Sequence, residues 1–350
     1  MSLPDEWKAK RPDFPWLEDG ALEAVQTLMQ AEGWLDPGEQ VESCARAGEG
    51  NMNLTLRVVT NRRSVILKQA RPWVEKYNFI PAPWDRAIAE FRFYERASRI
   101  PPVRDRMPQL HAASAAYRCL LLEDLGEASD LTSIYGGAPI AAEEIRTLGA
   151  FIATLHQASR GMPDPAFANL DMRALNHEHI FRVPLLHNNG VDLEALEPGL
   201  TTVAESLRKD TLYQSLSEQT GHRYLADGPC LLHGDFFPGS WLRTPSGIRV
   251  IDPEFCFYGD PEFDVAIALA HFCLADRPRT DATLLLESYG SALPLDEGWI
   301  ASYAAAEVMR RLLGVAQLPI APSCGFRAQR LHAARRAMLT KDWRLLWTLD

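Results

Sequence analysis

The 350-residue chain lacks the features that would place it in a membrane or a secretory pathway. No apolar run approaches the roughly 18 residues that a membrane-spanning helix needs. The longest, VAIALAHFCLA at 265–275, is typical of a buried helix. The first residues, MSLPDEWKAKRPDF, lack the apolar core of a secretory signal. The sequence therefore predicts a cytoplasmic protein without membrane segments.

The chain also lacks a basic excess and any paired cysteine motif. Its 36 Lys and Arg stand against 46 Asp and Glu, a net charge of −10. This balance argues against a broad surface for nucleic acid or anionic membrane, but it permits a local basic site for a small anion. The six cysteines are scattered singly, without a CxxC spacing. They are predicted to be reduced, buried thiols rather than a disulfide framework or a zinc site.

The N-terminal part of the chain has a β-rich pattern. Residues 21–34 show helical spacing of apolar residues, and NLTLRVVT and SVILKQA around the polar NRR predict a β-hairpin. An amphipathic helix is predicted over 85–98, with Ile88, Phe91 and Tyr94 on one face. YRCLLLEDLG at 117–126 predicts another strand, which an acidic pair and a glycine end.

Helical patterns dominate from about residue 140, as in 141–159 and 300–318. Among them, CLLHGD and IRVIDPEF are predicted to form a short hairpin across the turn-prone RTPSG. No internal repeat is evident. We therefore predict an α+β protein with a small β-rich N-terminal lobe, 1–126, and a larger, mainly helical C-terminal lobe, 127–350.

Two acidic motifs suggest a chemical function. Asp235, in LLHGDFFPGSWL, follows an apolar strand and is placed in a loop, where catalytic side chains are often found. Asp252 and Glu254, in VIDPEF, stand two residues apart, so in an extended segment both carboxylates would face one Mg²⁺. Each alone could be an ordinary turn carboxylate. Their order, with Ser240 five residues after Asp235, is that of kinase-type phosphoryl-transfer enzymes.

A phosphoryl-transfer site of this kind also needs a lysine for phosphate oxygens. Lys68 lies within the apolar SVILKQA, where burial would require a partner, and Glu90 in the following helix can provide one. Upstream, GEGNMNL places Gly48 and Gly50 where bare backbone could approach phosphates. Taken alone this glycine loop is a weak signal, because glycine is also the usual turn residue.

Taken together, these motifs resemble those of the aminoglycoside phosphotransferase and choline kinase superfamily, which has a bilobed protein-kinase-like fold. Within it the chain is most similar to the methylthioribose kinases. The likeness is carried by GEGNMNL, VILKQA, HGDFFPGSWL, VIDPEFCFYGDPEFD and AEVMRRLLGVAQ, and it spans about 45–320. It implies transfer of the γ-phosphoryl group of ATP to a hydroxyl of a small sugar-like acceptor, with Mg²⁺ as cofactor. It also implies a homodimer.

The resemblance assigns roles to individual residues. Asp235 would be the catalytic base, and Asp252 and Glu254 would hold Mg²⁺ with Ser240 close by. Lys68 would contact the α and β phosphates of ATP and pair with Glu90. The other implied positions are the glycine loop (Gly48, Gly50, Asn51), the adenine-binding hinge (Glu123, Leu125) and the acceptor-binding pair (Arg310, Arg311).

The acceptor is less well defined than the phosphoryl chemistry. Phe237 stands where methylthioribose kinases usually carry histidine. An aminoglycoside, choline or homoserine kinase of the same superfamily is therefore an alternative, as is a non-catalytic nucleotide-binding module. Arg310 and Arg311, about 100° apart on a helix, could instead be surface residues, with Glu307 pairing to Arg311 at i,i+4.

Three further polar positions have simpler interpretations. His233 is predicted to be structural. Asp264 is predicted to cap the helix that begins near it, with bracing of the catalytic loop as the alternative. His177 and His179 have a metal-like spacing but lack further ligands of matching spacing, which argues against zinc.

Overall fold

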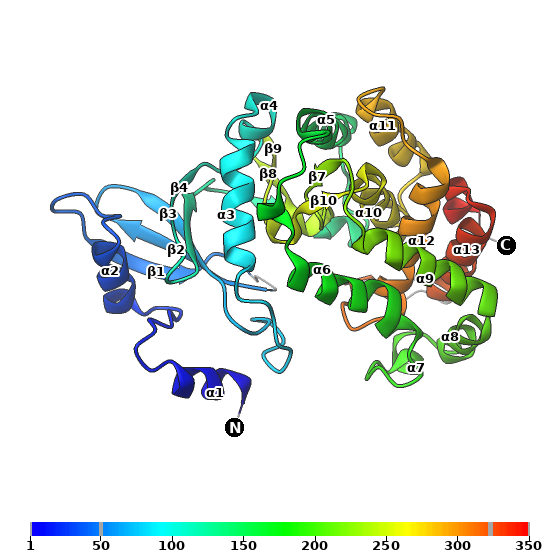
Figure 1. The fold of residues 1–350 in the computed structure, drawn as a ribbon, viewed down its shortest axis with the longest axis horizontal. Coiled ribbons are helices and arrows are strands. Elements are labelled where there is room, and N and C mark those ends of the chain that lie inside the picture. The colour runs from blue at the N-terminus through cyan, green and yellow to red at the C-terminus, as the bar shows by residue number, and fades with distance from the viewer. Residues whose placement is uncertain (1, 49–51, 321–324, 349–350) are drawn as a thin grey trace. The chain divides into compact units, whose positions relative to one another are not determined.

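The computed structural model of the chain describes residues 2–48, 52–320 and 325–348. These residues form two compact units, Met1–Glu127 and Ala128–Asp350. The first is built on an antiparallel sheet, and the second is mainly helical (Figure 1).

A five-stranded sheet in the order β1-β2-β3-β5-β4 forms the centre of the N-terminal unit. Its strands are β1 (Val41–Arg46), β2 (Leu54–Thr60), β3 (Ser64–Gln69), β4 (Leu110–Ser114) and β5 (Cys119–Glu123). The predicted hairpin is confirmed as β2 and β3, and the predicted strand at 117–126 as β5. Strand pairs are antiparallel throughout.

Two helices cover opposite faces of this sheet (Figure 1). The helices of the unit are α1 (Leu3–Lys10), α2 (Leu22–Ala31), α3 (Arg86–Ala97) and α4 (Pro101–Arg104). Helix α2 packs its apolar stripe against alternate residues of β2, β3 and β5 to form the main core. On the other face of the sheet, α3 packs against β4 and β5. On α3, Tyr94 of the predicted apolar face is buried together with Phe93, while Ile88 and Phe91 are only half-buried.

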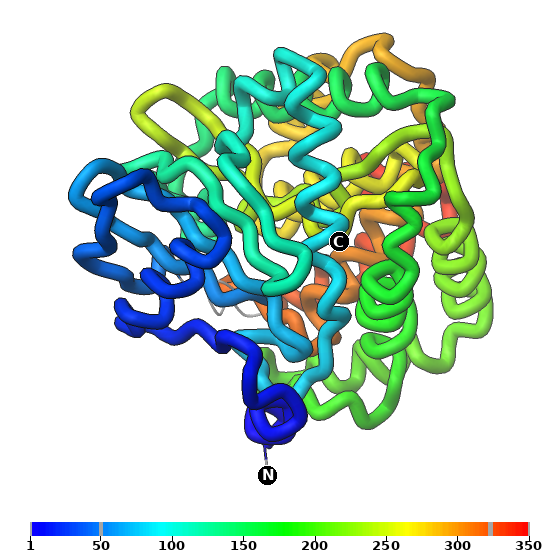
Figure 2. Tube along the Cα trace, turned by 60° about the vertical axis from the view of Figure 1, so that its left-hand side comes forward, coloured from blue at the N-terminus to red at the C-terminus, as the bar shows by residue number. Residues whose placement is uncertain are grey.

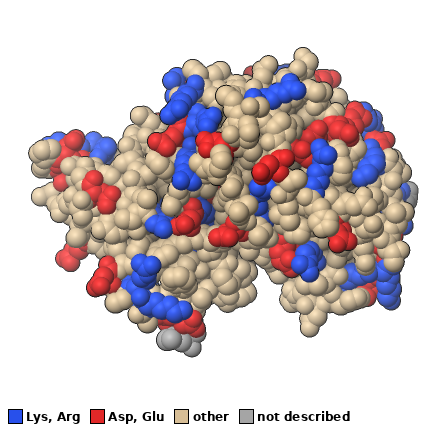
Figure 3. Space-filling model, in the orientation of Figure 1, with Lys and Arg blue, Asp and Glu red and all other residues tan. Residues whose placement is uncertain are grey.

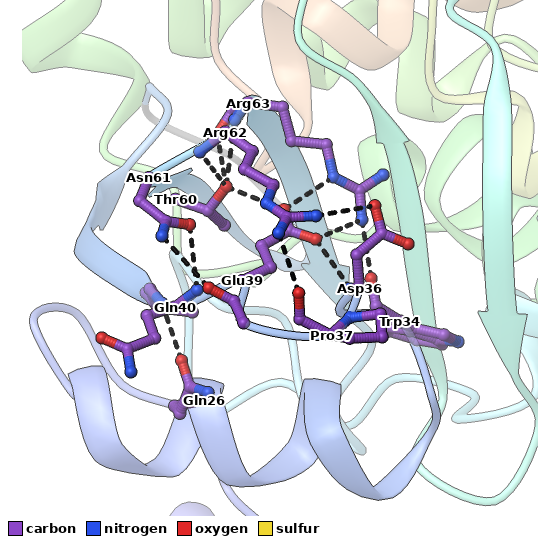
Figure 4. Close-up of polar contacts among 12 residues, drawn as sticks. Gln26, Trp34, Asp36, Pro37, Glu39, Gln40, Thr60, Asn61, Arg62 and Arg63 are labelled. Carbon is purple, nitrogen blue, oxygen red and sulfur yellow. Dashed lines mark hydrogen bonds and ion pairs between the residues drawn. The ribbon is translucent and has the colours of Figure 1, made fainter.

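A polar cluster anchors the turn of the β2–β3 hairpin (Figure 4). The buried carboxylate of Glu39 accepts hydrogen bonds from Arg63 Nε at 2.9 Å, Thr60 Oγ1 at 2.8 Å and the Asp36 amide at 2.9 Å. Burial alone would raise the pKa of Glu39, but these donors outweigh it and lower the pKa to about 2. The cluster ties the hairpin turn to the segment between α2 and β1.

The C-terminal unit is mainly helical. Its α-helices are α5 (Ala142–Ser159), α6 (Leu170–His177), α7 (Leu193–Leu196), α8 (Leu200–Lys209), α9 (Thr211–Leu225), α10 (Pro261–Leu274), α11 (Arg279–Tyr289), α12 (Glu297–Leu313) and α13 (Phe326–Thr340). Short 3₁₀ turns are η1 (Thr132–Gly136), η2 (Pro165–Phe167), η4 (Val183–Leu185), η5 (Pro238–Ser240), η6 (Pro253–Phe255) and η7 (Trp343–Trp347), and η3 (Glu178–Arg182) is a π-helical turn. Every residue of α10 is buried, as its apolar sequence predicts. Helix α12 packs against α10 and α13 (Figures 1 and 2).

The strands of this unit correct one prediction. Strand β7 (Cys230–Leu232) pairs with β10 (Phe257–Gly259), and β9 (Gly247–Val250) pairs with β8 (Trp241–Thr244), which also pairs with β6 (Ser129–Asp130). The predicted hairpin of CLLHGD with IRVIDPEF is therefore wrong. Strand β8 was not predicted, and the turn-prone RTPSG segment joins β8 to β9.

On the surface of the described residues, charges of both signs are mixed. The face drawn in Figure 3 shows Lys and Arg side chains interspersed with Asp and Glu. Within the described part of the chain, no helix is both long and apolar enough to cross a membrane. The five cysteines among these residues are all buried.

Candidate active site

Lys68 forms a buried ion pair within the N-terminal unit. It lies on β3 with Thr55 of β2 and Leu120 of β5 as strand neighbours, and it is 3% exposed. Its Nζ lies 2.8 Å from Oε1 of Glu90 on α3, which is fully buried. Breaking such a pair would leave an uncompensated buried charge. The predicted pairing is confirmed, and it explains how an apolar strand accommodates a lysine.

Arg86, one turn before Glu90 on α3, forms hydrogen bonds with the second half of the GEGNMNL motif. Its guanidinium group donates to the carbonyl of Met52 at 2.8 Å, to Oδ1 of Asn53 at 3.0 Å and to the carbonyl of Arg71 at 2.6 Å. Arg86 is almost completely buried. Helix α3 therefore contacts both Lys68 and the second half of the GEGNMNL motif.

Of the two predicted nucleotide-binding segments, the glycine loop is described only in part and the hinge in full. Gly48 has a φ of +123°, a backbone conformation that favours glycine. Gly50 and Asn51 lie outside the described residues. At the predicted hinge, Glu123 ends β5 and accepts a hydrogen bond from the Gln109 amide at 3.0 Å, while Leu125 is half-buried.

The loop with Asp235 begins where β7 ends, and Asp264 braces it. The fully buried carboxylate of Asp264 accepts hydrogen bonds from the amides of His233 at 2.7 Å and Gly234 at 2.9 Å, and His156 Nε2 lies 3.1 Å from it. Burial opposes its charge, yet these partners lower the pKa of Asp264. The prediction that Asp264 caps α10 is wrong because Asp260 occupies the N-cap position. The bracing alternative is confirmed.

Further hydrogen bonds join this loop to the segment that carries Asp252. His233 Nε2 donates to the Ile251 carbonyl at 2.9 Å, which supports its predicted structural role. The Ser240 hydroxyl donates to the Asp235 carbonyl at 3.0 Å, and the Ile251 amide donates to the Ser240 carbonyl at 3.0 Å. Ser240 thus links the predicted base to the predicted metal turn through its side chain and its backbone.

Gly234 allows these two segments to pack closely. Its φ is +85°, and a Cβ added there would lie 2.1 Å from the Phe255 carbonyl oxygen. No side chain fits at that distance, and L-residues rarely adopt that φ. Glycine is therefore required for the Asp235 loop to contact the turn that contains Glu254.

The Asp252–Glu254 segment is not extended, contrary to the prediction. Asp252 has the left-handed values φ 63° and ψ 50°, and η6 follows immediately with Pro253 at its first position. Asn169 Nδ2 stabilises this turn by donating to the carbonyls of Glu254 at 2.9 Å and Cys256 at 3.0 Å. The proline favours a turn here, and a left-handed aspartate is uncommon enough to suggest a functional constraint.

The donor atoms of this turn fit a magnesium ion. Asp252 and Glu254 offer carboxylate oxygens, which hard divalent cations prefer. Among the described residues, no group of three or more His, Cys, Asp and Glu side chains forms a metal-binding cluster. Mg²⁺ commonly uses one or two protein carboxylates and takes its other ligands from water and substrate phosphates.

Arg310 and Arg311 converge on Asp235 although they are adjacent on α12. Their nitrogens lie 3.9 Å and 3.7 Å from Asp235 Oδ1, and the residues are only 8% and 6% exposed. The surface interpretation is therefore wrong. Glu307, one turn earlier, pairs with Arg310 at 3.2 Å and with Arg311 at 2.6 Å. Long side chains overcome the 100° offset because one carboxylate draws both guanidinium groups together.

Asp235 combines a shielded position with a buried oxygen that accepts no hydrogen bond within the described chain. Its side chain is 17% exposed, and within the described chain its Oδ1 accepts no hydrogen bond. Burial raises the pKa of Asp235 to about 6, while the neighbouring Arg310 and Arg311 lower it and Glu307 and Glu254 raise it. A carboxylate with a pKa near neutral and an oxygen that accepts no hydrogen bond is well suited to accept a proton.

Glu307 is also connected to Tyr135 by a buried series of hydrogen bonds through His271. The Tyr135 hydroxyl on η1 hydrogen-bonds His271 Nδ1, and His271 Nε2 on α10 lies 3.1 Å from Glu307 Oε1. Burial lowers the pKa of His271 to about 4, so its ring is neutral at pH 7. The Phe237 ring packs 5.1 Å from the His271 ring and 4.9 Å from the Arg311 guanidinium carbon.

Comparison with known proteins identifies the family of the chain. The model of the phosphotransferase enzyme family matches residues 43–299. The chain belongs to this family. The methylthioribose kinase of Exiguobacterium sibiricum is 30% identical over 278 residues, 75% of this chain and 67% of that protein. That of Bacillus cereus is 26% identical over 245 residues, 66% of this chain and 60% of that protein.

Solved structures of other proteins show the same fold. The choline kinase LicA from Streptococcus pneumoniae matches with a TM-score of 0.52 at 14% identity, covering 91% of this chain and 98% of that one. A spectinomycin phosphotransferase, solved with ADP and spectinomycin, matches with a TM-score of 0.51 at 12% identity, covering 92% and 98%. At these identities the likeness establishes the protein-kinase-like α+β fold that the sequence predicted.

Sequence reasoning missed several residues that shape the site. Tyr135, His271 and Asn169 lie far in sequence from the residues they contact and belong to no recognisable motif. A single buried polar residue in an apolar helix, such as His271 in VAIALAHFCLA, was the one available signal.

Proposed function

We propose that the protein transfers the γ-phosphoryl group of ATP to a hydroxyl of a small sugar-like acceptor, with methylthioribose as the first candidate. The observation that carries this proposal is the Asp235 carboxylate, whose Oδ1 accepts no hydrogen bond within the described chain and lies beside two arginines. Such a group can accept the proton of an attacking hydroxyl. Membership of the phosphotransferase family and the likeness to methylthioribose kinases support the same reaction.

The residues of each unit have distinct tasks in this proposal. In the N-terminal unit, Lys68 contacts phosphate oxygens of ATP and Glu90 keeps its ammonium group in place. In the C-terminal unit, Asp252 and Glu254 hold Mg²⁺, and Ser240 keeps the Asp235 loop beside them. Bound Mg²⁺ supplies neutralisation of the charge on the phosphates. Most of the rate enhancement then comes from positioning, because the loose transition state requires little covalent assistance.

The arginine pair favours a neutral or anionic acceptor. Guanidinium groups donate hydrogen bonds to hydroxyl, carboxylate or phosphate oxygens, and they repel ammonium groups. With Arg310 and Arg311 beside Asp235, a polycationic aminoglycoside or a choline would approach like charges. A hydroxyl-rich sugar avoids that repulsion.

An ADP-release assay with a panel of acceptors tests the proposal. The purified chain is incubated with ATP and Mg²⁺ plus methylthioribose, choline, homoserine or an aminoglycoside, and the product is identified by its added phosphate mass. We expect turnover with the sugar, and loss of turnover when EDTA removes Mg²⁺. Asp235→Asn should lower kcat by about 10²–10⁴-fold while ATP still binds in a thermal-shift titration. Asp13→Asn, at an exposed position, is the matched control.

Other outcomes lead to different conclusions. Full activity in the Asp235→Asn variant would contradict the assignment of the base. Turnover with choline or an aminoglycoside alone would keep the kinase chemistry but replace the acceptor. Mg²⁺-dependent ATP binding without transfer to any acceptor would favour a non-catalytic nucleotide-binding module.

A further inference from the structure

Glu307 stands out among the buried groups because no part of the proposed reaction uses it. Its carboxylate is fully buried and has three partners: Arg310 Nη1 at 3.2 Å, Arg311 Nε at 2.6 Å and His271 Nε2 at 3.1 Å. A buried carboxylate is costly unless it is fully paired. Here the pairing involves the same two arginines that approach Asp235.

The two carboxylates therefore compete for the same guanidinium groups. Both arginines are within hydrogen-bond distance of Glu307, but they lie 3.7 Å and 3.9 Å from Asp235 Oδ1, beyond the usual N–H···O range. In a shielded site an arginine would otherwise form short, charge-assisted bonds with a free carboxylate. Those bonds would block the oxygen that accepts the proton.

The neighbours of Glu307 fix its orientation. An ionised Glu307 can only accept, so the neutral His271 must carry its proton on Nε2 and accept at Nδ1. The Tyr135 hydroxyl is then the donor to Nδ1. On the other side, the Phe237 ring packs over the Arg311 guanidinium group, so Arg311 is held between an aromatic ring and a carboxylate.

We propose that Glu307, oriented by His271 and Tyr135, is a positioning residue that holds the guanidinium groups of Arg310 and Arg311 toward the acceptor and out of hydrogen-bond contact with Asp235. This inference rests on the proposed function for its kinetic meaning. Its geometric content, the separation of the arginines from Asp235, can be measured without any turnover.

Crystal structures and steady-state kinetics of Glu307→Gln provide the test. The amide keeps the size of the side chain but removes the charge that competes with Asp235. We expect at least one arginine to move within hydrogen-bond distance of Asp235 Oδ1. We also expect kcat to fall by about 10²-fold, as for a small misplacement of reacting groups, and the KM for the acceptor to rise while the KM for ATP stays unchanged.

Two companion variants separate positioning from general destabilisation. Glu197→Gln is the matched control, because Glu197 is another buried glutamate of this unit and accepts hydrogen bonds from the amides of Arg327 and Ala328. It should lower stability and leave both KM values unchanged. Tyr135→Phe removes only the hydroxyl group that hydrogen-bonds His271. From the loss of this one hydrogen bond we expect kcat to fall by about twofold to tenfold.

The outcomes discriminate clearly. If the arginines of the Glu307→Gln variant keep their wild-type distances from Asp235 and kcat stays within about twofold, a change smaller than one typical hydrogen bond produces, the inference is overturned. If they move onto Asp235 but the wild-type protein phosphorylates no acceptor, the positioning role stands and the proposed function fails. If Glu307→Gln does not fold, Tyr135→Phe decides. Unchanged kinetics in that variant would refute the positioning role of the Tyr135–His271–Glu307 hydrogen bonds, and a selective loss of kcat would support it.

Discussion

The carboxyl group of Asp235 is held where its surroundings disfavour its charge. Its pKa of about 6 in the folded protein lies above the usual value of 3.8, so above pH 6 the folded state carries a charge that the unfolded state accommodates more easily. The raised pKa makes the group a better base near neutral pH and a source of instability at the same time.

Replacing Asp235 with asparagine should therefore stabilise the protein. We expect the free energy of unfolding at pH 7.5 to rise by about 1–3 kcal/mol, from the size of the pKa shift. The difference should shrink as the pH falls from about 6 to 4, because the folded wild type then takes up a proton and loses its disadvantage. Urea unfolding at several pH values measures this. A variant that is less stable than the wild type at pH 7.5 would refute it.

Asp264 should behave in the opposite way. Its carboxylate accepts two amide hydrogen bonds in the Asp235 loop, and Asp264→Asn would place an amide against one of those donors. We expect a loss of about 2–4 kcal/mol of stability and a fall in kcat, because the loop loses its support. Thermal unfolding and the ADP-release assay check both effects.

On the scale of elements, the close packing of the Asp235 loop on η6 depends on Gly234. In Gly234→Ala the methyl group would overlap the Phe255 carbonyl, and the φ of +85° would be strained. We expect a loss of stability of about 2 kcal/mol or more together with a loss of activity. Gly190→Ala, which has a positive φ but no close neighbour, is the control that isolates backbone strain. Equal effects of the two substitutions would argue against the packing role.

The hydrogen bonds that Arg86 of α3 donates to Met52 and Asn53 should strengthen nucleotide binding. Arg86→Met removes the donors to Met52 and Asn53, which lie in the second half of the GEGNMNL motif. If ATP binds there, its dissociation constant should rise about tenfold or more, in line with the loss of hydrogen bonds from a charged group. Arg99→Met, at an exposed position just after α3, should leave it unchanged. Calorimetric titration with ATP measures both.

Local patterns predicted the elements better than their partners. The α2 pattern, the β2–β3 hairpin and α5 were predicted because helical spacing and a short turn are visible within a few residues. The pairing of β7 with β10 was not, since the partner strand begins 25 residues after β7 ends and nothing local encodes the choice. The left-handed Asp252 was missed for a similar reason, because the surrounding turn imposes it.

In the candidate site, too, local patterns were more informative than contacts between distant residues. The Lys68–Glu90 pair was predicted, because a lysine in a buried strand needs a partner. The Glu307–Arg311 pair followed from i,i+4 spacing, but only within the alternative that placed both arginines on the surface. The convergence of Arg310 on Asp235 and the contact between Tyr135 and His271 depend on tertiary packing, so no spacing rule could reveal them.

On the scale of the whole molecule, acid should destabilise the N-terminal unit through Glu39. The pKa of Glu39 is lowered to about 2, so the stability that its hydrogen bonds give the N-terminal unit is complete above its unfolded value of about 4.5 and is lost as the pH falls toward 2. Glu39→Gln should flatten this dependence. Glu42→Gln, at an exposed position on β1, should not.

Hydrogen exchange resolves this effect by region. Peptides from residues 34–63 should lose protection in the wild type between pH 4.5 and 2, after correction for intrinsic exchange rates. In Glu39→Gln the protection of the same peptides should be lower at pH 6 and nearly independent of pH below that. Identical profiles in the wild type and the variant would contradict the assigned role of Glu39.

The destabilising charge of Asp235 also affects how this protein would respond to selection for stability. A library screened only for expression or heat resistance would enrich neutral replacements at position 235, because they remove a disfavoured charge from a shielded site. The most robust clones from such a screen would then be inactive. Any effort to evolve a hardier form of this protein should therefore retain a functional readout in every round.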